Sequence, residues 1–371
     1  MLIYLAILLI GILVIYNNFR SNKKEEGFSN VLFTAGIDLV LSSFETWLDL
    51  ILPCIALVNG RLTRHDIKNI INASPKVDYI QLIIGIILII GGIGLRHYSK
   101  NKLYILNING YFDKRVENSR QELNLGDFEF KEREIDFIRI YNKAVQNCTL
   151  KYVAEDIVDE IKQKITSFKD ESKNFKRGYT GIAPIPFIML AGTFFKREKI
   201  DEYFEYDKKE THKYYRLTNA KRFFKKNKYP ILRSNTNIDN LYKQITEVVL
   251  AISITNRITT SDLSQFNGKA VVGLSVDNPD DNIIRYKEQL IEYVKIIQNI
   301  IKELKDKLPM IKKIHLVYAG QSCLAFELGK IIDDQQMPQI INYHYYNQGQ
   351  YKYPWGIIMN GNYTGKYVEH I

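Results

Sequence analysis

The sequence contains few of the residues from which disulfide frameworks and metal centres are built. Its 371 residues include only three cysteines, Cys54, Cys148 and Cys323, which are widely spaced and odd in number. Its six histidines are scattered and form no HxxxH or HxH pair. We therefore expect neither a disulfide framework nor a zinc site, and we predict that most of the chain lies in a reducing, cytosolic environment.

The short motifs of the common nucleotide-dependent and metal-dependent enzymes are also missing. The chain has no GxxxxGK(S/T) phosphate-binding loop, no HExxH pair and no CxxC pair. The carboxylates of DNPDD, residues 277–281, indicate a loop and a helix N-cap more simply than a metal site, because Pro279 cannot lie inside the helix that follows. We therefore predict no metal, no cofactor and no catalytic residue.

Basic residues outnumber acidic ones, with 51 Lys and Arg against 41 Asp and Glu and a formal net charge of +10. This excess favours an anionic partner: nucleic acid, a nucleotide or lipid headgroups. Long uncharged apolar runs occur only near the N-terminus, at residues 1–16 and 79–95. The basic residues that follow the second run place its C-terminal side in the cytoplasm, and no cleavage site follows the first run. We predict a membrane region at 1–100 and a soluble region at 101–371.

The stretch between the two runs, residues 30–58, is apolar but has a polar stripe at helical spacing. The stripe consists of Thr34, Asp38, Ser42, Glu45 and Asp49. Two interpretations stay open: a helix lying on the membrane surface, or a third span whose Asp38, Glu45 and Asp49 face a protein interior or an aqueous path. The number of spans is therefore two or three. Glycines at 91, 92 and 94 would allow helices to approach closely, which suits self-association.

The soluble region shows the pattern of an α/β fold with a mainly parallel sheet. Helices are predicted at 132–145, 153–168 and 282–308, and strands at 248–254, 270–276, 314–318 and 339–346. An internal repeat supports a duplicated Rossmann-like unit with halves at about 101–240 and 241–371. Five residues of the first half recur 139 residues later without a gap: Tyr179, Gly181, Phe187, Phe204 and Tyr206, matched by Tyr318, Gly320, Phe326, Tyr343 and Tyr345.

The blocks YTGIAPIPFIMLAG at 179–192 and IHLVYAGQSCLAFELG at 314–329, followed by YKYPWGI at 351–357, resemble the signatures of the SAVED domain. SAVED domains are fused pairs of CARF-like Rossmann units that bind cyclic oligonucleotide second messengers in CBASS anti-phage systems. The resemblance covers roughly residues 125–371. Together with the membrane region, it implies an architecture similar to the transmembrane-SAVED effectors.

The resemblance implies several further properties. The protein is expected in the bacterial inner membrane as a multi-pass protein with a cytoplasmic C-terminal domain. Its expected partners are a cyclic oligonucleotide, the lipid bilayer, other copies of the chain after ligand binding, and functionally a nucleotide cyclase of the same defence system. The expected activity is ligand-triggered membrane disruption and abortive infection. Some CARF-type domains cleave their own ligand, so weak ring-nuclease activity stays open.

Candidate ligand contacts lie at strand ends and helix starts, where free N–H groups suit a phosphate, cations favour a polyanion and aromatic rings stack on bases. They are Lys176, Arg177, Tyr179, Thr180, Gly181, Ser253, Thr255, Asn256, Arg257, Gly320, Gln321, Ser322, Tyr353 and Trp355. For each, a purely structural role is the alternative: a solvated surface for the cations, a helix start for the turns and a packed strand edge for the rings.

Two other functions are open. Ser322 or Cys323 at a helix start could be a nucleophile of a membrane-tethered hydrolase or nuclease, although GQSCL lacks the second glycine of a G-x-S-x-G elbow. No base is evident either, since His315 lies in the preceding strand and His344 in a later one. The third possibility is a passive scaffold that holds a polyanion on a basic face.

Overall fold

The computed structural model describes residues 24–43, 78–100, 102–123, 125, 130–219, 229–333, 337–347 and 351–369. The chain divides into two compact units, Met1–Lys102 and Leu103–Ile371. The apolar run at 1–16 and the acids Glu45 and Asp49 lie outside the described residues.

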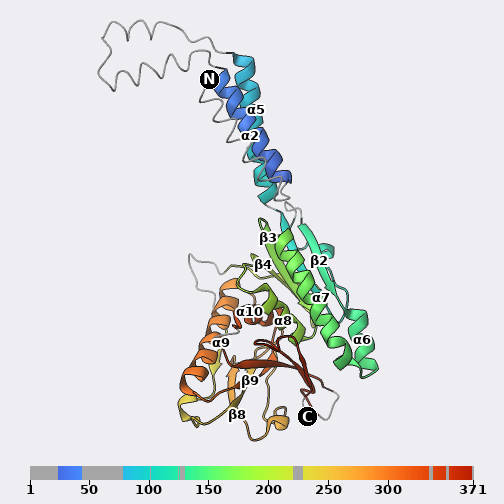
Figure 1. Cartoon of the computed structure of the whole chain (residues 1–371), viewed down its shortest axis with the longest axis vertical. Helices are drawn as coiled ribbons and strands as arrows, with labels where there is room; N and C mark the ends of the chain where they lie inside the picture. The colour runs from blue at the N-terminus through green and yellow to red at the C-terminus, as the bar shows by residue number, and fades with distance from the viewer. Residues whose placement is uncertain are drawn as a thin grey trace, which may run out of the picture. The chain divides into compact units, whose positions relative to one another are not determined.

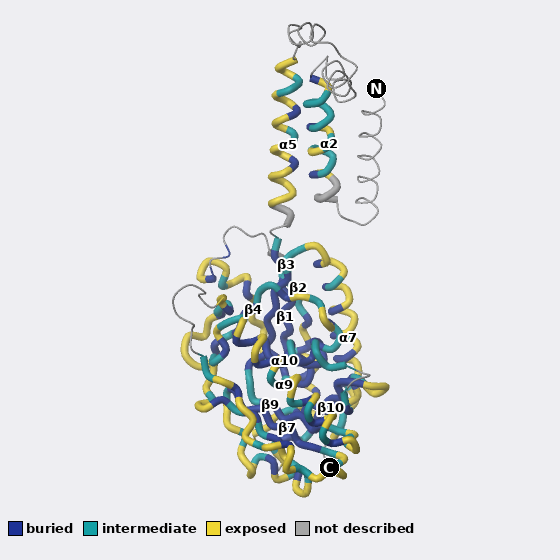
Figure 2. The backbone as a smooth tube through the Cα atoms, turned by 90° about the vertical axis from the view of Figure 1, so that its left-hand side faces the viewer, coloured by how far each residue is buried: buried dark blue, intermediate teal, exposed yellow. Residues whose placement is uncertain are grey.

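The described residues of the N-terminal unit form two antiparallel helices, α2 (Lys24–Ser42) and α5 (Tyr79–Lys100), which lie side by side (Figures 1 and 2). Ser29 Oγ near the start of α2 donates a hydrogen bond to the carbonyl oxygen of Gly92 at 2.8 Å. At the other end, Gln81 Nε2 donates to Ser42 Oγ at 2.7 Å. Side-chain hydrogen bonds thus join α2 to α5 near both ends of the helix pair.

Glycines allow the two backbones to approach closely. A Cβ added to Gly36 would lie 2.7 Å from the carbonyl oxygen of Gly85, and one added to Gly92 would lie 2.9 Å from the backbone nitrogen of Phe33. An added Cβ on Gly91 or Gly94 would meet nothing within 4 Å. Only the second of the three glycines at 91, 92 and 94 therefore contacts α2.

Among the described residues, the segment Tyr79–His97 of α5 is the one helix long and apolar enough to cross a membrane. The apolar part of α2, Phe28–Ser42, is shorter, and its Asp38 is half-buried. That α5 crosses the membrane is supported by the length and composition of the helix, and it stays a prediction.

The first half of the C-terminal unit is a five-stranded sheet of order β2-β1-β3-β4-β5. Its first four strands are parallel, and β5 runs antiparallel to β4. The elements are β1 (Leu103–Asn109), β2 (Phe130–Asp136), α6 (Ile138–Gln146), α7 (Leu150–Glu171), β3 (Lys176–Ile182), α8 (Ile185–Phe195), β4 (Glu202–Tyr206) and β5 (Tyr214–Arg216), with a 3-10 turn at Val116–Ser119.

The second half is a seven-stranded sheet of order β12-β11-β10-β9-β7-β8-β6. Strands β8, β7, β9 and β10 are parallel, whereas β6, β11 and β12 run antiparallel to their neighbours. The elements are β6 (Arg233–Ser234), β7 (Glu247–Ser253), β8 (Ala270–Ser275), α9 (Lys287–Lys307), β9 (Lys313–Ala319), α10 (Ser322–Ile331), β10 (Gln339–His344), β11 (Trp355–Ile358) and β12 (Tyr367–Glu369), with 3-10 turns at Ile238–Asn240 and Ser264–Phe266.

The two halves share one topology, which confirms the α/β fold. The order β8-β7-β9-β10-β11 repeats β2-β1-β3-β4-β5 with the same strand directions. The repeated residues of the sequence fall on matching elements, β3, α8 and β4 in one half and β9, α10 and β10 in the other. Strands and helices thus recur in the same order around the matched glycine turns.

Two predicted boundaries are wrong. The expected helix at 132–145 is strand β2 followed by the shorter helix α6, because an edge strand with charges at nearly every position lacks the apolar alternation of a buried strand. The helix expected from 282 begins at Lys287, since Asn282 has a φ of 58° and lies in a turn before it. Strand β1 has no counterpart among the predictions.

Helices α8 and α10 join the two halves (Figure 1). A Cβ added to Gly329 would lie 1.9 Å from the carbonyl oxygen of Met189, and one added to Gly192 would lie 2.1 Å from that of Phe326. The ring of Tyr179 stacks on Phe326 with centroids 4.1 Å apart. Buried residues of both halves belong to one continuous core, which follows the strands and this helix pair (Figure 2).

Candidate functional site

A cavity of about 200 Å³ lies where the two glycine turns meet. Its lining includes Gly181 near the end of β3, Gly320 just after β9, Ser322 at the start of α10, Thr255 after β7 and Glu205 of β4. These positions are at or near the carboxyl ends of parallel strands, where open α/β sheets place their ligands. The cavity is smaller than the roughly 300–1,000 Å³ of typical small-molecule sites, so it suits one part of a larger ligand.

Each glycine turn is shaped by a tyrosine two residues earlier. A Cβ added to Gly181 would lie 2.6 Å from the hydroxyl oxygen of Tyr179, and one on Gly320 would lie 2.4 Å from that of Tyr318. Both tyrosines are buried, and the Tyr318 hydroxyl donates to the carbonyl oxygen of Gln321 at 2.8 Å. In each copy of the Tyr-x-Gly pattern, the tyrosine ring therefore packs against the glycine two residues later. Tyr179 is thus a core residue and does not face the cavity.

This arrangement predicts a rescue by double substitution. Gly181→Ala should destabilise the chain by about 1–3 kcal/mol, because the new methyl group overlaps the Tyr179 hydroxyl. In a Tyr179→Phe background, the ring atom nearest to the added Cβ lies 3.3 Å from it. Gly181→Ala should then lower the free energy of unfolding by less than half as much as in the wild-type background. Thermal unfolding of the four chains measures the coupling, and additive effects would contradict this account of the turn.

Glu205 is buried, and its carboxylate caps α10. Its Oε1 accepts a hydrogen bond from the backbone N–H of Cys323 at 2.5 Å and another from Ser322 Oγ at 3.0 Å. Burial raises the pKa of Glu205, and the hydrogen bonds from Cys323 and Ser322 oppose this shift. The start of α10, which we predicted would offer free N–H groups to a phosphate, thus already holds an anion of the chain itself.

Lys208, just beyond β4, also lines the cavity. Burial lowers its pKa, and the negative charges of Glu205 and Asp281 act in the opposite direction. The rings of Tyr111 and Phe112 lie under its ammonium group, with centroids 5.7 and 5.8 Å from Nζ. The cavity therefore has one carboxylate and one ammonium group on a single wall.

The side chain of Gln321 borders the cavity but is fully engaged. Its Oε1 accepts from the backbone N–H of Ile284 at 2.6 Å. Its Nε2 donates to the Tyr215 hydroxyl at 2.6 Å and to the carbonyl oxygen of Ile284 at 3.2 Å. Gln321 thus ties the loop before α9 to strand β5, which is a structural role.

Lys176 and Arg177 lie at the amino end of β3, away from the glycine turns at its carboxyl end. The Arg177 side chain is buried: its Nε donates to Ser172 Oγ at 2.8 Å, its Nη2 donates to a main-chain carbonyl of α7, and its Nη1 pairs with Glu198. In the described conformation this cation therefore lies away from the glycine turns, and its contact with a ligand stays a prediction. Thr180, in the middle of β3, is also fully buried.

Two further predicted residues, Ser253 and Arg257, line another cavity, of about 390 Å³, at the ends of β7 and β8. Ser253 Oγ accepts from the backbone N–H of Ile258 at 3.0 Å, and Arg257 Nη2 donates to the carbonyl oxygen of Asp277 at 3.1 Å. Asn256 is exposed between them in the sequence. The structure thus separates these residues from the cavity at the glycine turns, although Thr255 lines the latter.

Tyr353 and Trp355 are packed rings. Tyr353 is buried in a small cluster with Phe266, and Trp355 stacks on His344 with centroids 4.7 Å apart. Burial lowers the pKa of His344 to about 4, so its imidazole is neutral at pH 7. Neither aromatic ring is presented to a base in the described conformation. His315 bonds to Glu247 and Tyr343, which leaves it unsuited to activating Ser322.

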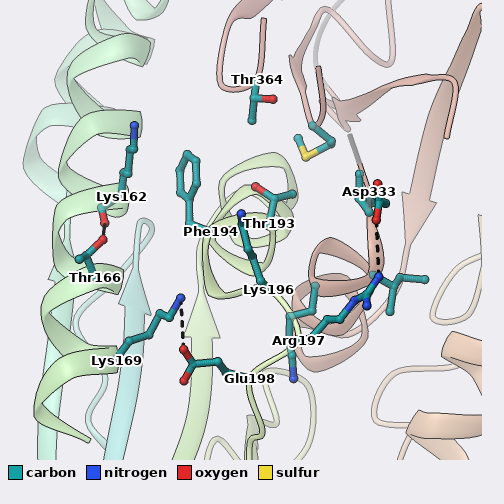
Figure 3. A pocket seen from close by; sticks show the side chains of 14 residues that line it. Lys162, Thr166, Lys169, Thr193, Phe194, Lys196, Arg197, Glu198, Asp333 and Thr364 are labelled. Atoms are coloured by element: carbon teal, nitrogen blue, oxygen red, sulfur yellow. Dashed lines mark hydrogen bonds and ion pairs between the residues drawn. The ribbon is translucent and has the colours of Figure 1, made fainter. Parts of the chain in front are cut away.

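A larger cavity, of about 900 Å³, lies at the opposite end of the α8–α10 pair (Figure 3). Its cations are Lys162, Lys169, Lys196, Arg197 and Lys330. Figure 3 shows two of them in ion pairs, Lys169 with Glu198 at 3.3 Å and Arg197 with Asp333 at 3.5 Å. Cations near a helix C-terminus interact favourably with the helix dipole and stabilise the helix. This structural role explains why much of the basic charge gathers at this cavity.

Glu205 and Lys208 are site residues that the sequence reasoning missed. A signal was present, because the repeat aligns Glu205 with His344, 139 residues later, and places an ionisable residue between aromatic ones in both copies. Among the described residues, no group of three His, Cys, Asp or Glu side chains is arranged to hold a metal ion.

The fold and the cavity define a duplicated α/β protein with a small cavity where the glycine turns of its two halves meet. The sequence profile of SAVED, the "SMODS-associated and fused to various effectors sensor domain", matches residues 161–359. The chain therefore belongs to the SAVED family. No curated protein matches it.

Solved structures with similar folds include the Cap4 SAVED/CARF-domain containing receptors of two bacteria. The Acinetobacter baumannii receptor with 3'3'3'-cAAA is 14% identical, and the match covers 77% of this chain and 55% of that chain with a TM-score of 0.44. The Moraxella osloensis receptor is 15% identical, over 72% of this chain and 52% of that chain, also with a TM-score of 0.44. The chain thus spans about half the length of these receptors.

Proposed function

We propose that the chain is a membrane-anchored receptor and effector of CBASS antiviral immunity, and that it is not an enzyme. A cyclic oligonucleotide, made by a nucleotide cyclase of the same system, binds between the two halves of the SAVED domain. Binding drives assembly of several copies, and the N-terminal helices then disrupt the bacterial inner membrane. One observation carries the proposal: the turns of the duplicated unit, at Gly181 and Gly320, meet at a single cavity.

The packing of α2 on α5 supports a membrane role for both helices. A helix lying on the membrane surface would be free of α5, whereas Ser29 and Ser42 hydrogen-bond to it near the two ends of α2. If α5 crosses the bilayer, α2 crosses beside it with Asp38 on its surface. The ligand can favour the assembled form only through a higher affinity for it.

The test uses the full chain in detergent micelles. Calorimetric titration with cyclic di-, tri- and tetranucleotides should identify at least one that binds about tenfold or more tightly than its linear form. Lys208→Gln should weaken that binding about tenfold, because it removes the cation of the cavity wall. The matched control is the neighbouring Lys209→Gln, whose exposed ammonium group pairs with Asp280 and should leave affinity within about twofold.

The outcomes separate the alternatives. Equal, salt-sensitive binding of linear and cyclic forms would support a polyanion scaffold instead. Cleavage of the ligand that is lost in Ser322→Ala would support a hydrolase. Vesicles filled with dye and carrying the full chain should leak only after the cyclic ligand is added, and ligand binding without leakage would remove the membrane step from the proposal.

A further inference from the structure

The start of α10 is a site that would ordinarily attract a phosphate, but it is occupied from within. Exposed N–H groups and the helix dipole favour an anion at such an end. Here the Cys323 N–H and the Ser322 hydroxyl both donate to Oε1 of Glu205, which belongs to the other half of the domain. A phosphate at this place would bring a second negative charge against a buried carboxylate, and the two would repel.

The hydrogen bonds of the Glu205 carboxyl group determine what else it can accept. Within the described part of the chain, the N–H and O–H donors to Glu205 both bond to Oε1, and the thiol of Cys323 also hydrogen-bonds to this carboxyl group, whose side chain lines the cavity of about 200 Å³. Each oxygen of an ionised carboxylate has two lone pairs and only accepts hydrogen bonds. The carboxylate can therefore accept a further hydrogen bond from a group that enters the cavity.

The matching position in the other half carries no such charge. The repeat places His344 of β10 where Glu205 stands in β4. Its imidazole is neutral and stacks on Trp355. His344 does not line the cavity, whereas Asp281 of the second half does. A ligand would therefore meet the carboxyl group of Glu205 from one half and that of Asp281 from the other.

We propose that Glu205 selects the part of the ligand that enters this cavity: a nucleobase with an exocyclic amino group, whose N–H donates to the carboxylate, and not a phosphate. This rests on the proposed function and adds the chemistry of recognition at its site. Adenine, guanine and cytosine have such an amino group. Uracil has no amino group. Its ring N–H lies between two carbonyl oxygens, and the negative charge of a carboxylate repels these oxygens.

The experiment compares rings of equal size. The full chain in detergent micelles is titrated with cyclic homo-oligonucleotides of each base, with two, three and four nucleotides. The titration is made at pH 8, because burial raises the pKa of Glu205 and a higher pH favours its ionised form. The best amino-bearing ring should bind about tenfold or more tightly than the uridylate of the same size, since a hydrogen bond to a charged group is at stake. Glu205→Gln should reduce this ratio about tenfold, because its amide can keep the Cys323 bond while turning an NH₂ group toward the cavity.

The matched control is Glu210→Gln, an exposed carboxylate in the turn after β4, which should keep the wild-type ratio within about twofold. Ser322→Ala controls for a folding defect in Glu205→Gln, because it removes one hydrogen bond to Oε1 but keeps the carboxyl group. Even if the affinities of this variant for the amino-bearing ring and for the uridylate both fall, the ratio between them should match that of the wild type. A preference for uridylate, or an unchanged ratio in Glu205→Gln, overturns the assignment of Glu205 alone. If the wild-type chain binds no cyclic oligonucleotide, the proposed function itself fails.

Discussion

Gly329→Ala should destabilise the SAVED domain by about 3 kcal/mol or more, although alanine in a helix is ordinarily better than glycine by about 1 kcal/mol. The new Cβ would lie 1.9 Å from the carbonyl oxygen of Met189 and 2.9 Å from its carbonyl carbon. Both atoms belong to the backbone of α8, so no side-chain rotation relieves the overlap. The two helices must move apart, and the core that both halves share must open with them.

Thermal unfolding followed by the fluorescence of the buried Trp355 measures this effect, and the midpoint should fall by about 5–10 °C. Gly273→Ala is the control, because its Cβ would meet only side-chain atoms of Asn235 at 3.8 Å. It should change stability by no more than about 0.5 kcal/mol. A Gly329→Ala chain as stable as the Gly273→Ala chain would mean that α8 and α10 do not meet at this point.

The parts of the fold that could be predicted are those with a local pattern. The apolar spacing of α9 and the Tyr-x-Gly repeat are visible in the sequence, and the repeat alone brings the turns at Gly181 and Gly320 into correspondence. Strand β2 was misread because its charged residues lie at a sheet edge, where the usual alternation is weak. Local sequence contains no information on which strand occupies an edge.

The sequence predicts that the two glycine turns lie close together, but it does not predict which side chains line the cavity between them. That the turns after β3 and β9 meet follows from duplication and from the rule on strand ends. Which side chains turn inward depends on partners far away: Glu205 meets Cys323, 118 positions along the chain, and Arg177 is held by Glu198 from the loop before β4. A buried carboxylate on an aromatic strand looks unfavourable until the helix that it caps is known.

Gln321→Leu gives the sharpest test between a structural residue and a ligand contact. Leucine keeps nearly the same volume but removes the bonds to Tyr215 and to both backbone groups of Ile284. Ile284 is fully buried, so its N–H would lose its partner without gaining water. We expect a loss of about 2–3 kcal/mol in the free energy of unfolding.

Thermal unfolding measures the loss, and hydrogen exchange of the loop before α9 should accelerate because its anchor to β5 is gone. The control is Gln163→Leu on the exposed face of α7, which should change stability by less than about 0.5 kcal/mol. If Gln321→Leu instead keeps the wild-type stability and loses affinity for the cyclic ligand, then the side chain turns to the ligand, as the sequence predicted. In that case its bonds to Ile284 must break on binding, and ligand recognition would be coupled to a movement of the loop before α9.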